Sequence, residues 1–259
     1  MVFVNHLLGI ISIPLGVFSP EGGYIMGQQG SETALVSLWR SNEVSAWRDA
    51  LAKYWNHRPV RRNIDVERHM DRLTPEDRDV ILASGAALVD FLEHWYYSWK
   101  FFSIAPYDIP KHQAKVRAEY ATNPAKYDAI ARSLGSLNPD NVEQCLTYVA
   151  SRSIPGLQIS AGSGVLAVLY PTWFGTVDQH TLRALQTLDG DGAEWLRRHI
   201  PGPETFFPAN NNDLGRHAAK LMTQLYRQKS QELAQLDEET GWTPRRVEMV
   251  CYILRPRTR

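Results

Sequence analysis

The sequence predicts an all-α fold. Apolar residues recur near helical spacing over much of the chain. Several helix starts are marked by a Thr or Asn cap followed by proline. Strand signals are scarce, because few runs alternate apolar with polar residues and the β-branched residues are scattered. The sequence contains no internal repeat and no low-complexity segment.

The composition is that of an ordinary globular protein, and we expect residues 1–259 to form a single unit. A chain of 259 residues can bury one large core or two tightly joined lobes. Its 28 basic residues equal its 28 acidic residues, so a polyanionic partner must be met by a local basic patch. Cys145 and Cys251 are too few for a disulfide framework, a zinc site or an iron-sulfur cluster. We therefore expect a reduced, cytoplasmic setting and no metal or other cofactor.

Residues 1–30 are expected to form an N-terminal extended or loop-like segment that packs on the domain. Prolines and the Gly22-Gly23 pair mark turns in it. Its first 18 residues are apolar, but Asn5 and His6 interrupt them and no Lys or Arg precedes Arg40. A signal peptide needs a positive start, and a membrane-spanning helix needs about 20 uninterrupted apolar residues. This pattern therefore favours a buried segment, with no membrane partner.

Residues 31–137 are expected to form a helical lobe with an aromatic cluster. The apolar spacing over residues 31–55 fits one helix, or two helices broken near Ser41-Asn42. The run Thr74-Pro75-Glu76-Asp77 combines a cap, a proline at the first position and acidic groups in the first turn. It predicts a helix that starts there and extends toward Phe102.

Further helices follow from caps and helical spacing. They are expected at Pro124–Leu134 after Asn123, at Pro139–Ser151 after Asn138, at Asp213–Leu236, and at Pro244–Leu254 after Thr243. Residues 138–200 then form a separate segment with the motif described next, and residues 201–259 form the C-terminal helices.

Residues 154–185 carry the most specific pattern in the chain. A helix ends before Pro155-Gly156, a tight turn follows, and a helix of small residues runs from about Ser160 to Leu169. It leads into Val177-Asp178-Gln179-His180. This segment resembles the helix-hairpin-helix DNA glycosylases, the superfamily of endonuclease III, the adenine glycosylases and the alkylated-base glycosylases.

The resemblance implies two helical lobes with a cleft between them, and a role for each matched position. Pro155 and Gly156 match the hairpin that presents backbone amides to a DNA phosphate. Asp178 matches the catalytic aspartate that starts the next helix, and Arg183 falls where the family often has a basic residue. Successive amides at a turn and a helix start form an anion site, so the backbone from Gly156 to Ala161 is expected to bind phosphate.

Two positions depart from the family pattern. Gln158 stands where the second hairpin glycine belongs, and a left-handed backbone there would be strained with a side chain. Ser160 stands where members that also cut the strand have a Schiff-base lysine, and serine cannot form an imine. The iron-sulfur cysteines of some members are also missing. The resemblance therefore implies a monofunctional glycosylase without lyase activity.

Asp178 is the predicted catalytic carboxylate. Cleavage of a glycosidic bond develops positive charge on the sugar, which a carboxylate stabilises or uses to activate water. A base in a duplex must be flipped out to reach such a pocket, and aromatic rings offer it stacking surfaces. The candidates for this base pocket are Trp95, Tyr96, Trp99 and Trp173. The expected partner is double-stranded DNA carrying a damaged or modified base, whether in repair or in defence against foreign DNA; no protein partner is implied.

A second interpretation stays open. Asp178 can be only a helix cap, and the protein can be a non-catalytic DNA-binding or protein-interaction scaffold of the same fold. The pairs Arg61-Arg62 and Arg245-Arg246 are typical of solvated faces, and matter as phosphate contacts only on the hairpin side. An acid in a pocket flanked by a basic surface favours the enzyme, whereas an acid bonded only to its own helix amides favours the scaffold.

Overall fold

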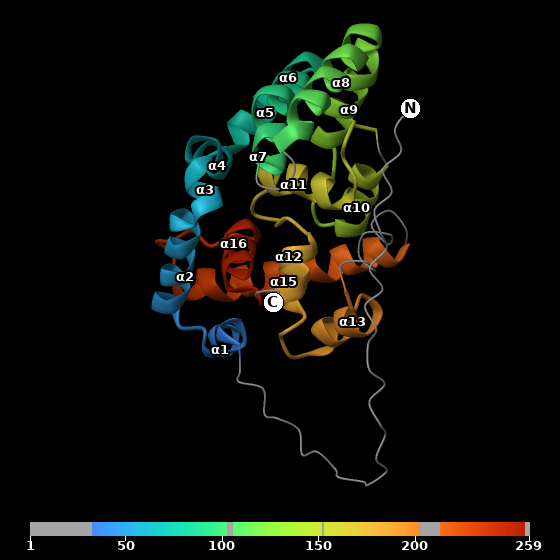
Figure 1. The fold of residues 1–259 in the computed structure, drawn as a ribbon. Helices are drawn as coiled ribbons and strands as arrows, with labels where there is room; N and C mark the ends of the chain where they lie inside the picture. Colours follow the sequence, from blue (N-terminus) through green and yellow to red (C-terminus); the bar gives the residue numbers. More distant parts are fainter. Residues whose placement is uncertain (1–32, 103–105, 152, 203–212, 257–259) are drawn as a thin grey trace, which may run out of the picture. The chain divides into compact units, whose positions relative to one another are not determined.

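The computed structural model describes residues 33–102, 106–151, 153–202 and 213–256, and this part of the chain is helical with no β-strand. The all-α prediction is confirmed, while the N-terminal segment of residues 1–30 lies outside the described residues. Figure 1 shows the arrangement of the helices. Their bounds are α1 Ala34–Ser41, α2 Val44–Asn56, α3 Arg58–Arg62, α4 Ile64–Asp71, α5 Pro75–Leu82, α6 Gly85–Phe91, the π-helical turn η1 Leu92–Tyr96, α7 Tyr97–Phe101, the 3₁₀ turn η2 Pro106–Asp108, α8 Ile109–Thr122, α9 Pro124–Gly135, α10 Val142–Ala150, α11 Ile159–Leu169, α12 Gln179–Leu185, α13 Asp191–His199, α15 Asp213–Leu236 and α16 Pro244–Leu254.

Capping residues set most of the predicted helix starts. The hydroxyl of Thr74 accepts from the amide of Asp77, and the Asp77 carboxylate accepts from the amide of Thr74, which completes a capping box at α5. Asn123 caps α9 and Thr243 caps α16, as predicted. The chain breaks between α1 and α2 at Asn42, whose φ of 52° is left-handed.

Two helices differ from the prediction, each because a nearer cap takes over. The helix that begins after Thr74 ends at Leu82, because the Ser84 hydroxyl accepts from the amide of Ala87 and starts α6. The chain then continues as α6, η1 and α7 to Phe101. The helix α10 starts at Val142 and not at residue 139, because Asn141 is its cap.

The helix α11 is the most deeply buried element. All of its residues except Ser160 are buried, and it packs against α10 and α15. A Cβ atom at Gly162 would lie 2.7 Å from the Val149 side chain of α10, and one at Gly164 would lie 2.7 Å from the Tyr96 hydroxyl. The small residues of the motif therefore let two neighbouring segments approach α11 closely.

The aromatic run is tied to the hairpin by hydrogen bonds. Tyr97 is fully buried and its hydroxyl donates to the carbonyl of Pro155 at 2.9 Å. Tyr96 is fully buried as well and its hydroxyl donates to the carbonyl of Ala161. These bonds satisfy two buried phenols and hold α11 and the preceding turn against η1 and α7.

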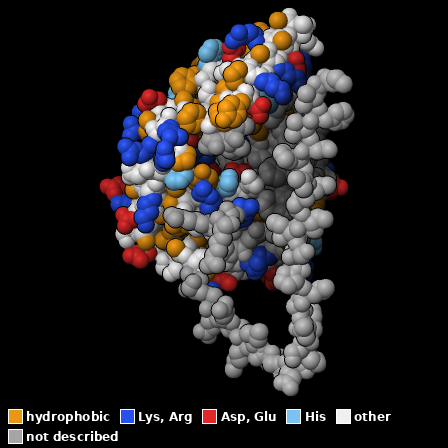
Figure 2. Space-filling view, viewed as in Figure 1, with side chains coloured by type: hydrophobic (Ala, Val, Ile, Leu, Met, Phe, Trp, Pro, Cys, Tyr) orange, Lys and Arg blue, Asp and Glu red, His pale blue; other side chains and the backbone are white. Residues whose placement is uncertain are grey.

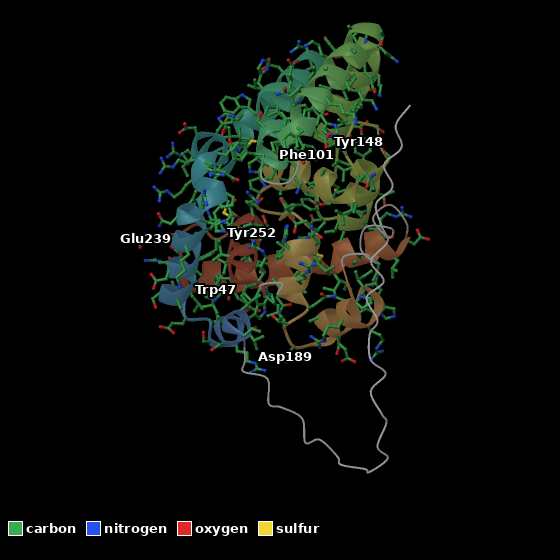
Figure 3. The ribbon with its side chains drawn as sticks, in the orientation of Figure 1. Trp47, Phe101, Tyr148, Asp189, Glu239 and Tyr252 are labelled. Carbon is green, nitrogen blue, oxygen red and sulfur yellow. The ribbon has the colours of Figure 1, made fainter. Side chains whose placement is uncertain are left out.

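A second aromatic group fixes α1 and α2 on the C-terminal helices. Trp47 of α2, which is labelled in Figure 3, is fully buried, and its ring centroid lies 5.8 Å from both Trp39 and Trp242. The helix α16 packs in turn against α2, α12 and α15. Within the part of the chain that the structure describes, no helix has the length and apolar character needed to cross a membrane.

Gly85→Ala is expected to lower the free energy of unfolding by about 1–3 kcal/mol. The Gly85 amide donates to Asp128 of α9 at 2.7 Å, and a Cβ atom there would lie 2.5 Å from the Asp128 nitrogen. Because that atom is backbone, α6 or α9 must shift. Urea denaturation measures the change. Gly135→Ala is the matched control, since its nearest neighbour is a Leu82 side-chain carbon at 3.9 Å; equal stability of the two variants would contradict the close packing of α6 on α9.

Candidate functional site

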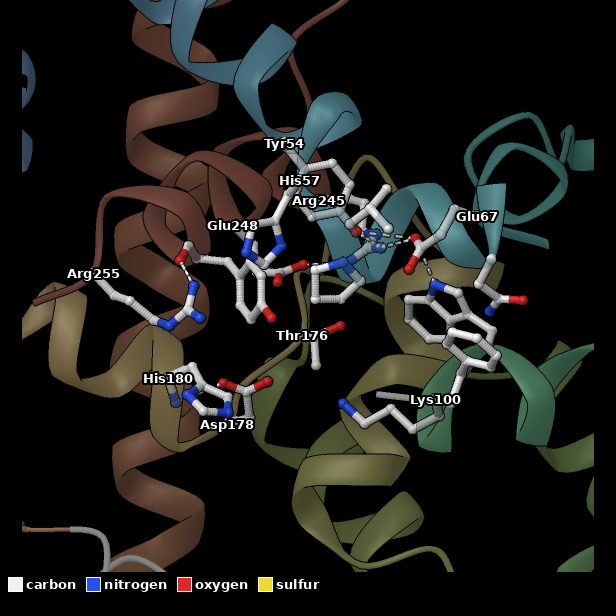
Figure 4. Close-up of a pocket in the computed structure, with 16 residues that line it drawn as sticks. Tyr54, His57, Glu67, Lys100, Thr176, Asp178, His180, Arg245, Glu248 and Arg255 are labelled. Atoms are coloured by element: carbon white, nitrogen blue, oxygen red, sulfur yellow. Dashed lines mark hydrogen bonds and ion pairs between the residues drawn. The ribbon is translucent and has the colours of Figure 1, made fainter. Parts of the chain in front are cut away.

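A cavity of about 390 Å³ lies among α2, α3, α4, α7, the start of α12, and α16. Figure 4 shows that its walls carry acids and bases from distant parts of the sequence. The charged and imidazole side chains that line it are His57, Glu67, Lys100, Asp178, His180, Arg245, Glu248 and Arg255. The remaining lining residues are Tyr54, Pro59, Val60, Asn63, Trp99, Phe102, Thr176 and Tyr252.

Asp178 caps α12 and also lines the cavity. Its Oδ1 atom accepts from the amides of His180 and Thr181 at 2.8 and 3.0 Å. Its own amide donates to the Thr181 hydroxyl at 3.2 Å, so the capping box is complete. Among the described residues no group donates a hydrogen bond to its Oδ2 atom. One carboxylate oxygen therefore orients the side chain, and the other is left for a ligand.

A hydrogen bond connects the Asp178 segment to the hairpin helix. The Ser163 hydroxyl of α11 accepts from the amide of Val177 at 3.0 Å and donates to the carbonyl of Ser160 at 2.9 Å. Val177 is itself fully buried. The position of the carboxylate is thus set by α11.

Lys100 approaches Asp178 from the opposite wall of the cavity. Its side chain leaves α7 and points toward the Asp178 carboxylate (Figure 4). No hydrogen bond or ion pair of its ammonium group is formed within the described part of the chain. Burial lowers the pKa of Lys100, and the carboxylates of Asp178 and Glu248 oppose that shift.

A buried ionic network forms another wall. Arg245 is 6% exposed, pairs with Glu248 of its own helix, and lies 3.6 Å from Glu67 of α4. Glu67 also accepts from the Tyr54 hydroxyl and the Trp99 indole, each at 2.9 Å. The Arg245 guanidinium stacks over the Trp99 ring with its carbon 4.7 Å from the centroid. These contacts hold the Trp99 ring in the wall of the cavity.

Burial raises the pKa of Glu248 to about 7, although Arg245 opposes this shift. This carboxyl group can therefore gain or lose a proton near neutral pH. The pKa values of His57 and His180 are lowered by burial. Their imidazoles are therefore neutral at pH 7, and both rings lie edge-on to Tyr252.

Two buried polar atoms on the cavity wall have no hydrogen-bond partner among the described residues. They are His57 Nδ1 and Thr176 Oγ1, and Thr176 is only 3% exposed. Buried polar atoms are almost always paired in folded proteins. Both atoms are almost inaccessible to solvent, so a group in the cavity does not reach them without a shift of the wall.

Basic residues gather beside the cavity. A neighbouring hollow is lined by Lys53, Arg183 and Arg255, and it shares Arg255, His57 and His180 with the cavity. Arg58, Arg61 and Arg62 of α3 line a further hollow, and α3 also contributes Pro59 and Val60 to the cavity. Figure 2 shows Lys, Arg and His side chains gathered on this face. We refer to Lys53, Arg58, Arg61, Arg62, Arg183 and Arg255 as the basic rim.

The predicted DNA-binding residues fall in two places. Arg183 lies on the basic rim. Pro155, Gly156, Gln158, Ser160 and Ala161 form the turn and the start of α11, outside the cavity lining.

The expected strain at Gln158 does not arise. Gly156 has a φ of 74° and takes the left-handed position of the turn. Gln158 has φ −115° and ψ −173°, which is an extended backbone that any residue adopts. A second glycine is not needed for this turn geometry.

Trp99 is the member of the predicted aromatic set that lines the cavity. Tyr96 is buried against α11. Trp95 stacks on His69 with centroids 3.8 Å apart, and Trp173 lies under Arg227. Helical geometry turns consecutive aromatic residues to different faces, so the run cannot line one pocket.

The sequence interpretation missed several residues of the cavity wall: Tyr54, Glu67, Lys100, Thr176, Arg245 and Glu248. The interpretation of Arg245-Arg246 as a solvated pair is wrong for Arg245, which is buried. A signal was present, because Arg245 and Glu248 are three residues apart within a helix whose other residues are mostly apolar, Arg246 excepted. The position of Lys100 inside an aromatic run was a weaker signal of a buried charge. No nearby residue distinguished Glu67 from an ordinary surface glutamate.

No three His, Cys, Asp or Glu side chains within the described ranges lie together in a way that could hold a metal ion. The cavity instead offers carboxylates, an amine, neutral imidazoles and aromatic side chains. This set suits binding of a polar aromatic ligand and acid-base chemistry on it.

Arg245→Met is expected to lower the free energy of unfolding by about 3–5 kcal/mol at pH 8, because Glu67 and Glu248 stay buried without their cationic partner. The loss is expected to be smaller at pH 6. The pKa of Glu248 is raised from 4.5 to about 7, so its protonated form predominates below pH 7, and the cost of burying the carboxylate grows as pH rises through that value.

Urea denaturation at both pH values measures this difference. Arg132→Met, at an exposed residue of α9, is the matched control and is expected to stay close to the wild type. A loss for Arg245→Met that is the same at pH 6 and pH 8 would show that Glu248 does not titrate in this range.

Comparison with known protein families, with curated proteins and with solved structures found no match to this chain.

Proposed function

We propose that this protein is a DNA glycosylase that draws a damaged or modified base out of double-stranded DNA into the cavity and releases it. The observation that carries the proposal is the placement of Asp178. Its carboxylate lies on the cavity wall, next to the basic rim, with one oxygen held by its helix and the other without a donor. We also propose the helix-hairpin-helix glycosylase fold, with two lobes and a cleft between them, and the cytoplasmic setting expected from the cysteine content.

The cavity suits a flipped base. Its volume of about 390 Å³ falls within the range of small-molecule sites. Apolar rings of Trp99, Phe102 and Tyr252 line it together with the acids and bases. A nucleobase combines a flat apolar face with a polar edge, which matches these wall groups.

The chemistry assigned to Asp178 is charge stabilisation and water activation. When the bond between C1′ and the base breaks, its electron pair leaves with the base and positive charge develops on the sugar. The Oδ2 atom of Asp178 stabilises that charge, and a water oxygen then bonds to C1′ while its proton passes to a carboxylate. Glu248, with a pKa of about 7, is suited to supply the proton that the leaving base takes.

Two features suit a phosphate backbone. The amide of Ser160 at the start of α11 makes no hydrogen bond within the described residues, and amides at a helix start attract anions, whereas the neighbouring Ile159 is fully buried. The basic rim adds local positive charge, although the whole chain has equal numbers of acids and bases. Together these two features provide the local positive charge that a protein of zero net charge needs in order to bind DNA.

Asp178→Asn is expected to lower base release by about 100-fold or more. Asparagine caps a helix as well as aspartate does, so folding is preserved while the charge is lost. Duplexes carrying varied damaged or modified bases are incubated with the protein. The released base is quantified by chromatography, and abasic sites are revealed with alkali.

The matched control is Asp191→Asn, at an exposed residue that begins α13, for which wild-type release is expected. If Asp178→Asn releases base at the wild-type level, Asp178 is not the catalytic carboxylate. No release from any substrate by the wild type would favour the non-catalytic scaffold, in which Asp178 serves α12 alone.

Arg183→Ala is expected to weaken DNA binding to a similar extent for all sequences, and to reduce the slope of log affinity against log salt by about 1. Arg183 lies on the basic rim, where it is expected to neutralise a phosphate. Fluorescence anisotropy with labelled duplexes at several salt concentrations measures the slope. Arg198→Ala on α13 is the control at an exposed site outside the rim; an equal effect of the two variants would argue against the rim as the DNA-binding surface.

A further inference from the structure

Lys100 combines three features that are unusual for a lysine. It lies on a cavity wall, its ammonium group has no hydrogen bond or ion pair within the described part of the chain, and it points at a carboxylate (Figure 4). Lysines that only bind solvent lie on exposed faces, and lysines with a structural role are paired with an acid, as Lys229 is with Glu232. Lys100 fits neither description.

The surrounding helices hold the Lys100 side chain in this place. Its nitrogen lies 5.9 Å from the centroid of the Trp99 ring. A Cβ atom at Gly164 would lie 3.6 Å from Lys100 Cδ, so the aliphatic stem runs close to the backbone of α11. The stem is packed between an indole and a buried helix, and the amine faces the cavity.

The burial of Lys100 also changes its protonation. Burial lowers its pKa, against the opposing effect of Asp178 and Glu248. A larger share of the side chain is therefore the neutral amine than in an ordinary exposed lysine. The neutral amine is the form that attacks carbonyl carbon.

We propose that Lys100 is a second catalytic residue, whose amine forms an imine with the aldehyde at C1′ of an abasic sugar held in the cavity. The proposal rests on the proposed function for the origin of that sugar, since the ring-opened abasic product is an aldehyde. It gives the protein a lyase activity. The expected absence of that activity was based on Ser160 alone, a residue at the start of α11 and outside the cavity lining.

The reaction needs no oxidant or reductant. The Lys100 nitrogen forms a bond to C1′, the carbonyl oxygen takes a proton, and water then leaves to give the protonated imine. A base removes a proton from C2′, and the phosphate on C3′ departs with the electron pair of its C–O bond. Hydrolysis of the imine by water returns the free amine. Asp178 faces Lys100 across the cavity and can accept the protons released in these steps.

The test supplies the abasic site directly, so it does not depend on base release by this protein. The full chain is incubated with a duplex containing one preformed abasic site and sodium borohydride, which reduces an imine to a stable secondary amine. We expect a covalent protein–DNA complex on a denaturing gel, with the attachment mapped to Lys100 by mass spectrometry of the wild type. Without borohydride we expect strand cleavage at the abasic site that needs no alkali.

Lys100→Gln is expected to reduce the trapped complex at least about tenfold, the smallest reduction that would be expected from loss of a covalent nucleophile. Lys115→Gln, at an exposed residue of α8 outside the cavity lining and the basic rim, is the matched control and is expected to trap DNA through Lys100. Thermal unfolding of both variants shows whether they fold.

The mapping on the wild type decides the matter even if Lys100→Gln is unstable. Absence of a trapped complex with the wild type, or attachment at another amine, overturns the proposal. If the abasic duplex is trapped through Lys100 while no base is released from any damaged substrate, the imine chemistry stands and the proposed glycosylase function fails. If base is released from a damaged substrate and abasic DNA is not trapped, the glycosylase function stands and the imine chemistry of Lys100 fails.

Discussion

The burial of α11 is the constraint on which the rest of the site depends. A helix buried on nearly all sides can be accommodated only if its neighbours approach its backbone, and Gly162 and Gly164 allow α10 and the η1–α7 run to do so. The Tyr96 and Tyr97 hydroxyls then bond the carbonyls of Ala161 and Pro155. The helix α11 therefore fixes the hairpin turn on one side and, through Ser163 and Val177, the Asp178 segment on the other.

The second constraint is the cost of burying charge. Arg245, Glu248 and Glu67 are taken largely out of water and are tolerated because they satisfy one another, with Tyr54 and Trp99 as additional donors. Such a network is a poor source of net stability, because desolvation offsets most of the attraction. Its effect is to position Trp99 and to keep Glu248 near its midpoint of titration at neutral pH. Lys100 is partly buried without a comparable partner, and this difference sets it apart from the other cations of the cavity.

The two interpretations of Asp178 prove to be compatible in geometry. A capping aspartate needs one oxygen for the amides of its first turn, and Asp178 uses Oδ1 for that purpose. The same bonds restrict the side chain to one rotamer, which places Oδ2 at the cavity. In the proposed glycosylase reaction, this cap would hold the carboxylate in place before charge develops near it.

The local features of this protein were readable from its sequence, because they depend on neighbouring residues. The helix starts at Pro75, Pro124 and Pro244, the break at Asn42 and the small-residue helix α11 follow from caps, turn propensities and spacing. The capping position of Asp178 belongs to the same class, since the amides it bonds lie within three residues. The predicted helix bounds were wrong where a nearby residue, Ser84 or Asn141, caps a helix in place of the expected start or continuation.

The composition of the cavity was decided by tertiary structure alone. Glu67, Lys100, Asp178 and Arg245 come from four different helical regions, and no periodicity relates residues that far apart in the chain. Burial of Arg245 could not be predicted from its residue type. Arginine is usually exposed, and this one is buried because α2, α4 and α7 cover it. The aromatic run shows the same limit: helical geometry directs Trp99 into the cavity and Tyr96 toward α11, and which face meets which neighbour depends on how the helices pack.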